Sequence, residues 1–193
     1  MATISHRRGT GDIVAALAAA VAAITLPNGK WGSALPTLSK AFDRVEVFDS
    51  EQLVEAFRYL LVTEQKVCVI VPMDERFNTT VDHRKLMITR ELPVMVLVSD
   101  RVLGSRNAAL LGDVDTPGAL ELTELVLPAV TGLLLPNQAG PPALSGVVVE
   151  PFSSSVLSVK DTESEMPSRV CVGLGLHCKG GYLEATMPAG PVY

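Results

Sequence analysis

Aromatic residues, cysteines and long apolar runs are all scarce in this chain of 193 residues. Aromatics make up only 5% of the sequence, and the three cysteines form an odd number without a CxxC pair. A disulfide framework is therefore not expected, and a reducing compartment is the default. The sequence holds no run of about 18 uncharged apolar residues, so we expect no membrane-spanning helix.

Positive charge is also in short supply. The chain has 16 Lys and Arg against 21 Asp and Glu, which gives a formal net charge of −5. An acidic chain has little non-specific affinity for nucleic acid, because the phosphates repel it. Hydrophobic residues nevertheless make up 48% of the sequence. This composition and length predict a globular domain with a sizeable core.

The most informative pattern is a long alternating stretch, 84–98, which reads RKLMITRELPVMVLV. Every second residue from Leu86 to Val98 is apolar except Arg90, so the stretch predicts a β-strand with one buried face. At ~3.3 Å per residue it could run roughly 50 Å, longer than an ordinary strand. Pro93 lacks an N–H group, so we expect an edge position or a bulge there. A strand of this length indicates an assembly surface more than a catalytic pocket.

Helical spacing predicts three helices. Residues 6–26 superficially resemble an export signal, with two arginines followed by an apolar run of small residues. Asp12 directly precedes that run, which is unfavourable for a signal, and the larger apolar residues recur at helical spacing. A packing helix at about 12–25 is therefore favoured over an export signal. Two further helices are expected, one at 50–61 and one that starts at Thr116-Pro117 and is kinked at Pro128.

The rest of the chain alternates as strands or is rich in turn-forming residues. The order of these segments predicts a mixed α/β (α+β) fold, a mainly antiparallel β-sheet with helices packed on it. We expect residues 1–178 to form a single domain and residues 179–193 to form a flexible C-terminal tail. Short strands are expected at 44–48, 66–71, 146–150, 155–161 and 169–178, and loops at 27–43, 72–82, 99–115 and 136–143.

An acidic motif, GDVDTPG, places Asp113 and Asp115 just before the third helix. Two acids at this spacing can ligate a divalent metal, as in a metal-dependent transferase. Helix capping and interaction with the helix dipole explain the same residues without a ligand. Capping is favoured because no third acid and no lysine completes a site.

A glycine-rich segment, Gly173 to Gly181 (GLGLHCKGG), does not fit a phosphate-binding loop. Such a loop needs its glycines between a strand and a helix, whereas these lie inside an expected strand. Close backbone packing or a bend is favoured. Cys171 and His177 share a face but lie about 20 Å apart along a strand, and Cys178 points to the other face, so no shared metal is expected.

Catalytic arrangements are not indicated elsewhere. His83 lies in a polar segment, and the sequence has no GxSxG turn that would present a nucleophilic serine. The serines at 153–155 are expected to form a polar turn. No pair of acids has a context that suggests general acid–base work. We therefore expect a protein that is not an enzyme and that has no catalytic, cofactor-binding or metal-binding residues.

Five residues are candidates for a protein interface, because arginine and aromatic side chains are favoured in such contacts. Arg76, Phe77, Arg101 and Arg106 lie in segments expected to be loops beside the long strand. Arg90 interrupts the apolar row of that strand and faces either the core or a neighbouring subunit. For those of the five that are exposed, the alternative is a solvated surface position without a protein partner.

The order of segments from Leu86 to Leu135 resembles the tail-terminator (tail-completion) proteins of long-tailed bacteriophages, most closely those of contractile tails. The segment ITRELPVMVLVSDRV is followed by LGSRNAALLGDVDTPGALELTELVLPAVTGLLL, and then by GVVVEP and RVCVGLGL. The resemblance covers about the last two thirds of the chain and is one of order and pattern, without an invariant motif. Residues 27–43 and the C-terminal tail do not match it.

The resemblance implies a homo-hexameric ring that is assembled in the host cytoplasm and lies in the virion, at the head-proximal end of the phage tail. Such rings stop polymerisation of the tail tube and provide the docking face for the head. The implied partners are other copies of the chain, the tail tube protein, the sheath as a further candidate, and a head-side connector protein. DNA would pass through the lumen without specific binding, and no catalytic residue is implied. Another neck or head–tail joining protein is the main alternative, and a metal-dependent enzyme is a weaker one.

Overall fold

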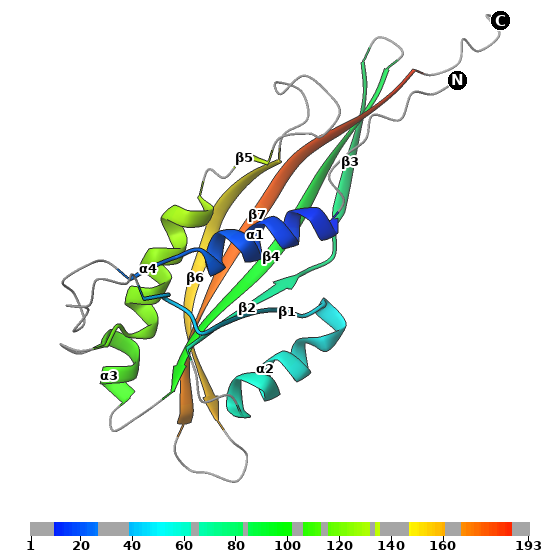
Figure 1. Cartoon of the computed structure of the whole chain (residues 1–193). Helices are drawn as coiled ribbons and strands as arrows, with labels where there is room; N and C mark the ends of the chain where they lie inside the picture. Colours follow the sequence, from blue (N-terminus) through cyan, green and yellow to red (C-terminus); the bar gives the residue numbers. More distant parts are fainter. Residues whose placement is uncertain are drawn as a thin grey trace, which may run out of the picture.

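The computed structural model describes residues 10–26, 39–62, 66–82, 85–101, 106–112, 116–131, 134–135, 147–160 and 167–186. Helices and a mixed sheet form an α+β fold, as expected (Figure 1). The elements are α1 (Thr10–Ala22), β1 (Arg44–Val47), a 3-10 turn (Ser50–Gln52), α2 (Leu53–Val62), β2 (Val67–Pro72), β3 (Arg76–Asp82), β4 (Lys85–Arg101), α3 (Arg106–Leu111), α4 (Ala119–Val130), β5 (Leu134–Leu135), β6 (Val147–Lys160) and β7 (Pro167–Thr186).

One sheet contains all of these strands, in the order β1-β2-β4-β7-β6-β5, with β3 paired to β4 beside β2. Among the described strands, only β1 and β2 are parallel to each other, and every other pair is antiparallel. The expectation of a mainly antiparallel sheet is therefore confirmed. The two longest strands, β4 with 17 residues and β7 with 20 residues, pair along nearly their whole length.

The predicted long strand is confirmed as β4, but Pro93 does not lie at an edge of the sheet. β2 ends opposite Val94 and β3 begins opposite Glu91, so the neighbouring chain is interrupted beside Pro93. The backbone N–H of Met73 donates to the Pro93 carbonyl over 2.9 Å. Because the N and C=O groups of one strand residue point to the same side, the missing N–H faces this interruption. The proline is tolerated in a central strand because its neighbour bulges there.

Helices cover both faces of the sheet (Figure 1). On one face, α1 and α4 pack against β2, β4 and β7. The predicted helix near the N-terminus is confirmed as α1, and its apolar stripe lies in the core: Ile13, Leu17 and Val21 are fully buried. Burial of side chains of this size stabilises the fold by about 1.5–3 kcal/mol each. Helix α1 is thus an integral part of the domain.

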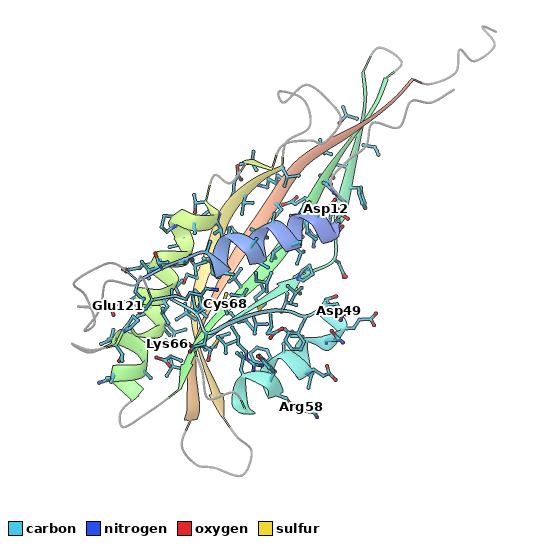
Figure 2. The ribbon with its side chains drawn as sticks, in the orientation of Figure 1. Asp12, Asp49, Arg58, Lys66, Cys68 and Glu121 are labelled. Carbon is cyan, nitrogen blue, oxygen red and sulfur yellow. The ribbon has the colours of Figure 1, made fainter. Side chains whose placement is uncertain are left out.

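The other face of the sheet carries α2. The Asp49 carboxylate accepts a hydrogen bond from the Gln52 backbone over 2.9 Å and caps the turn that leads into the helix (Figure 2). Ala56 and Leu60 of α2 are buried against β2. Since alternate residues of β2 contribute to the two cores, the strand is buried on both faces, as its uninterrupted apolar sequence predicts.

Several segment boundaries differ from the predictions because pairing partners distant in the sequence extend the strands. Residues 76–82 were expected to be a loop but form β3, which pairs with the first half of β4. The serines at 153–155 were expected to form a turn but lie within β6, which is one continuous strand. β7 continues to Thr186, so the predicted flexible tail from 179 is wrong up to that residue. Residues 187–193 lie outside the described residues.

The helical boundaries also differ in two places. Residues 106–111 form α3 within a segment expected to be a loop. The predicted third helix begins at Ala119, not at Thr116, and Glu121 accepts a hydrogen bond from the Gly118 backbone over 3.3 Å. Figure 2 shows Glu121 on the α3–α4 side of the molecule. Pro128 lies inside α4, and β5 follows where the helix was expected to continue.

Gly112 is predicted to be a stability determinant, because it ends α3 with φ +84°. A Cβ atom there would lie 2.6 Å from the Gly118 backbone nitrogen. Gly112→Ala should lower the free energy of unfolding by about 1–3 kcal/mol in urea denaturation, since it combines a strained backbone with a backbone clash. Gly11→Ala is the matched control: nothing lies within 4 Å of that Cβ, so stability should change by less than about 1 kcal/mol. Equal effects of the two substitutions would contradict the prediction.

Candidate assembly surface

An arm of three strands extends from the helix-covered body of the protein. It consists of β3, the part of β4 at 85–91 and the part of β7 at 179–186. In Figure 1 these strands run past the start of α1, away from α2, α3 and α4. Figure 2 marks this place with Asp12, on the first turn of α1. The arm therefore presents sheet surface that the helices do not cover.

Two of the predicted interface residues lie on this arm. Arg76 and Phe77 are the first residues of β3, not loop residues as expected. Both side chains are exposed, and Phe77 retains 56% of its accessible surface. The next three side chains of β3, through Thr80, are exposed as well. Because successive strand residues point to opposite faces, the 76–80 part of β3 is exposed on both faces in the isolated chain.

Arg90, for which the core and a neighbouring subunit were both considered, is buried within the single chain. Its side chain is 8% exposed and forms an ion pair with Glu75, which is 16% exposed. The Thr10 hydroxyl donates to Glu75 Oε2 over 3.0 Å, and Arg90 Nη2 donates to Thr10 Oγ1 over 3.3 Å. These contacts connect the start of α1, the interruption between β2 and β3, and β4. Arg90 therefore fixes the base of the arm.

The remaining two interface candidates are placed by their backbones only. Arg101 is the last residue of β4 and Arg106 is the first residue of α3, so neither belongs to a loop. Their side chains lie outside the described part of the structure, and their participation in an interface stays a prediction.

A second polar group, which sequence reasoning missed, lies on the face of the sheet that carries α2. Nδ1 of His177 on β7 lies 2.6 Å from Oε1 of Glu91 on β4. Lys179 on β7 pairs with Glu150 on β6 over 3.2 Å. The Phe152 ring lies over His177, with ring centroids 4.1 Å apart. Only cross-strand register brings these residues together, so no local sequence signal could have identified them.

The structure also places the motifs that were considered for chemistry. Cys171 and Cys178 are buried on opposite faces of β7, and the glycines at 173 and 175 lie inside that strand. Gly175 is covered by Phe152. Asp113, Asp115 and His83 lie outside the described residues. Among the residues that are described, no group of three or more His, Cys, Asp and Glu side chains is placed to hold a metal ion.

Comparisons with known proteins give no family assignment: no family model matches the chain, and no curated protein matches it. Within the described ranges, none of the helices is long and apolar enough to cross a membrane.

The buried ion pair is predicted to stabilise the fold through its charge balance. Arg90→Met should lower the free energy of unfolding by about 2–4 kcal/mol, because the Glu75 carboxylate would lose its cation in a mostly buried position. The double variant Arg90→Met/Glu75→Gln should be less destabilised than the single variant, since neither residue then carries a charge. Chemical denaturation of each variant measures these differences.

The exposed pair Lys179–Glu150 offers a control for that prediction. Its side chains are 47% and 55% exposed, so Lys179→Met should cost less than about 1 kcal/mol. An Arg90→Met effect no larger than the control, or strictly additive effects of Arg90→Met and Glu75→Gln, would show that the pair does not act as a unit.

The three cysteines are predicted to be unreactive in the native protein. Cys68, Cys171 and Cys178 have buried side chains, and none of the three is in a disulfide bond. Burial raises the pKa of the Cys178 thiol to about 12, and burial, followed by the nearby Cys171, raises the pKa of Cys68. Because thiolate is the reactive form, labelling with a disulfide reagent at pH 8 should be slow until denaturant exposes all three thiols. Rapid labelling of a native thiol would contradict this.

Proposed function

We propose that this chain is a structural protein of a bacteriophage virion, a tail terminator that forms a ring on the head-proximal end of the tail tube. In this role it stops tube polymerisation and provides the docking face for the head. The observation that carries the proposal is the arm, where residues 76–80 of β3 are exposed on both faces of the sheet. A surface of this kind suits contact with other protein subunits.

The order of elements supports the proposal. The segments on which the resemblance to tail terminators rests correspond to β4, α3, α4, β5, β6 and β7. The long strands β4 and β7 form the centre of the sheet, and α3 and α4 follow β4 on one of its faces. The resemblance therefore covers the central framework of the fold and not only peripheral segments.

The distribution of exposed apolar residues agrees with subunit contacts. Among the described residues, four of the seven exposed large apolar side chains are Phe77 on β3 and Val148, Phe152 and Val156 on β6. The other three lie on β1, α2 and α3: Val47, Val54 and Leu111. Single exposed apolar residues are ordinary, but these four lie on two strands near opposite sides of the sheet. Two such surfaces on one subunit are what a ring with head-to-tail contacts requires.

The charge of the chain suits a channel for DNA. Each copy carries a net charge of −5, so six copies at −5 each would carry about −30. A ring of that charge repels phosphates on average and would let DNA pass without retention. The partners proposed for this ring are the tail tube protein, the sheath and a head-side connector protein.

Assembly with purified tail tube protein tests this proposal. Native mass spectrometry of the chain, alone and mixed with tube protein, should show a hexameric ring in at least one condition. Negative-stain microscopy should show tubes capped at one end, with tube growth halted. A chain that stays monomeric and never caps tubes would refute the proposal. Binding to the connector protein but not to tubes would favour another neck protein.

Phe77→Asp tests whether the arm takes part in this assembly. A charge on this exposed side chain should abolish ring formation or tube capping, because an interface would have to bury it without a partner. Val54→Asp on α2 is the matched control, since Val54 is 59% exposed and lies outside the arm. Capping by Phe77→Asp at the level of the control would exclude the arm from the assembly contacts.

A further inference from the structure

β3 and most of β6 have open edges, meaning that no described strand pairs with their outer side. β3 pairs with β4 only. β6 pairs with β5 through Val147 and Val148 alone, so its later residues have no described strand beyond them. β3 lies on one side of the β4–β7 pair and β6 lies on the other. Among the described strands, β3 and β6 thus form the longest open edge on each side of the sheet.

Both edges contain a stretch without the usual protection against pairing. Exposed edges are commonly blunted by lysine, proline, bulges or short strand length. β3 is seven residues long, and its interior, 77–81, has no charged residue and no proline. β6 has a proline and a register shift near its start, but the stretch 153–159, SSSVLSV, is uncharged and regular until the next register shift. These two stretches are available for a β-ladder with another chain.

We infer that the open edge of β3 pairs with the open edge of β6 in a second copy of this chain. The inference rests on the proposed ring and specifies how its neighbours join. The directions of the strands are compatible. β3, β4, β7 and β6 are each antiparallel to the next, so β3 runs opposite to β6. Rotation about a ring axis keeps the sense in which each strand runs relative to that axis, so β3 meets the neighbouring β6 as an antiparallel pair.

The two edges also match in length and in side chains. β3 has seven residues and the open regular stretch of β6, 153–159, has the same length. When the two stretches are centred on each other, Thr79 lies opposite Val156. In this register Arg76 and Asp82 face the ends of the uncharged stretch, and no like charges oppose each other within it. Phe77 and Val156, which are 56% and 48% exposed in the single chain, would be covered.

The geometry adds a constraint on the ring. β3 lies beside the 85–91 part of β4, whereas the open stretch of β6 lies beside the 169–175 part of β7, nearer the opposite end of the sheet. The two edges are therefore offset along the strand direction. They meet only if the strands are inclined to the ring axis, as in closed β-barrels, where strand tilt and stagger are linked. The result is one sheet that continues from subunit to subunit.

Two other edges could compete for the same partner. β1 is the outermost strand next to β2, but it has only four residues, which is typical of a protected edge. The end of β7, residues 181–186, has no described strand on its outer side, but it runs parallel to β3, and parallel pairs are slightly less stable. Both alternatives can be distinguished by the position of a cross-link.

Disulfide cross-linking tests the inference, and the buried native cysteines make this feasible without removing them. Chains carrying Thr79→Cys are mixed with chains carrying Ser154→Cys, Ser155→Cys or Val156→Cys, oxidised, and separated on a denaturing gel. At least one mixture should give about tenfold more covalent dimer than either chain alone, because pairing raises the effective thiol concentration. A chain with both substitutions should give a ladder of covalent multimers.

Controls separate this contact from its alternatives. Thr79→Cys chains that cross-link to themselves would indicate a two-fold β3–β3 contact and overturn the inference. Cross-links to Val47→Cys on β1 or Glu184→Cys on β7, in preference to β6, would overturn it as well. Rings or capped tubes without any Thr79–β6 cross-link would reject the edge pairing while supporting the proposed function. A cross-linked ladder without tube capping would support the edge pairing and reject the tail-terminator role.

Discussion

The hydrogen-bonded ladder along β4 is the constraint on which the rest of this structure depends. β4 pairs with β7 on one side through nearly its whole length, and with β2 and then β3 on the other. Every backbone polar group of a central strand needs such a partner when it is buried. A strand of 17 residues is longer than the helices that cover it, so the ladder must continue into a region without a helix. The arm is the consequence of that excess length.

Pro93 links this ladder to the polar network at the base of the arm. Its missing N–H interrupts the pairing on one side of β4, and the chain between β2 and β3 gains an extra residue there. Glu75 lies in this interruption, from which it reaches Arg90 and Thr10. The positive charge of Arg90, which interrupts the apolar row of β4, is thereby neutralised by Glu75 next to the start of α1. One irregularity thus allows a central proline, accommodates a buried arginine and attaches α1 to the sheet.

Periodic segments could be predicted from the sequence, whereas strand extents and cross-strand contacts could not. The packing stripe of α1 and the alternation of β4 are local patterns, and both were predicted correctly. The sequences of β3 and of the serine-rich part of β6 alternate only weakly between apolar and polar residues. They form strands because the long strands β4 and β7 provide backbone hydrogen-bond partners beside them. The position of Arg90 was ambiguous for the same reason, since its partner Glu75 depends on a bulge. The contact between Phe152 and His177 depends on register alone.

The exposed serines of β6 illustrate why an open edge is informative about assembly. A strand that remains permanently at an edge usually places lysine or proline along it, because its unpaired backbone groups would otherwise recruit other chains. The stretch 153–159 instead presents small hydroxyl side chains and apolar residues that fit either face of a larger sheet. Ser153 and Ser155 are paired with Gly175 and Gly173 of β7. Because glycine has no side chain, these two serine side chains lie close to the β7 backbone. An edge that is regular, uncharged and paired on its inner side with a long strand is suited to accept a further strand, and β3 has the direction and length to be that strand.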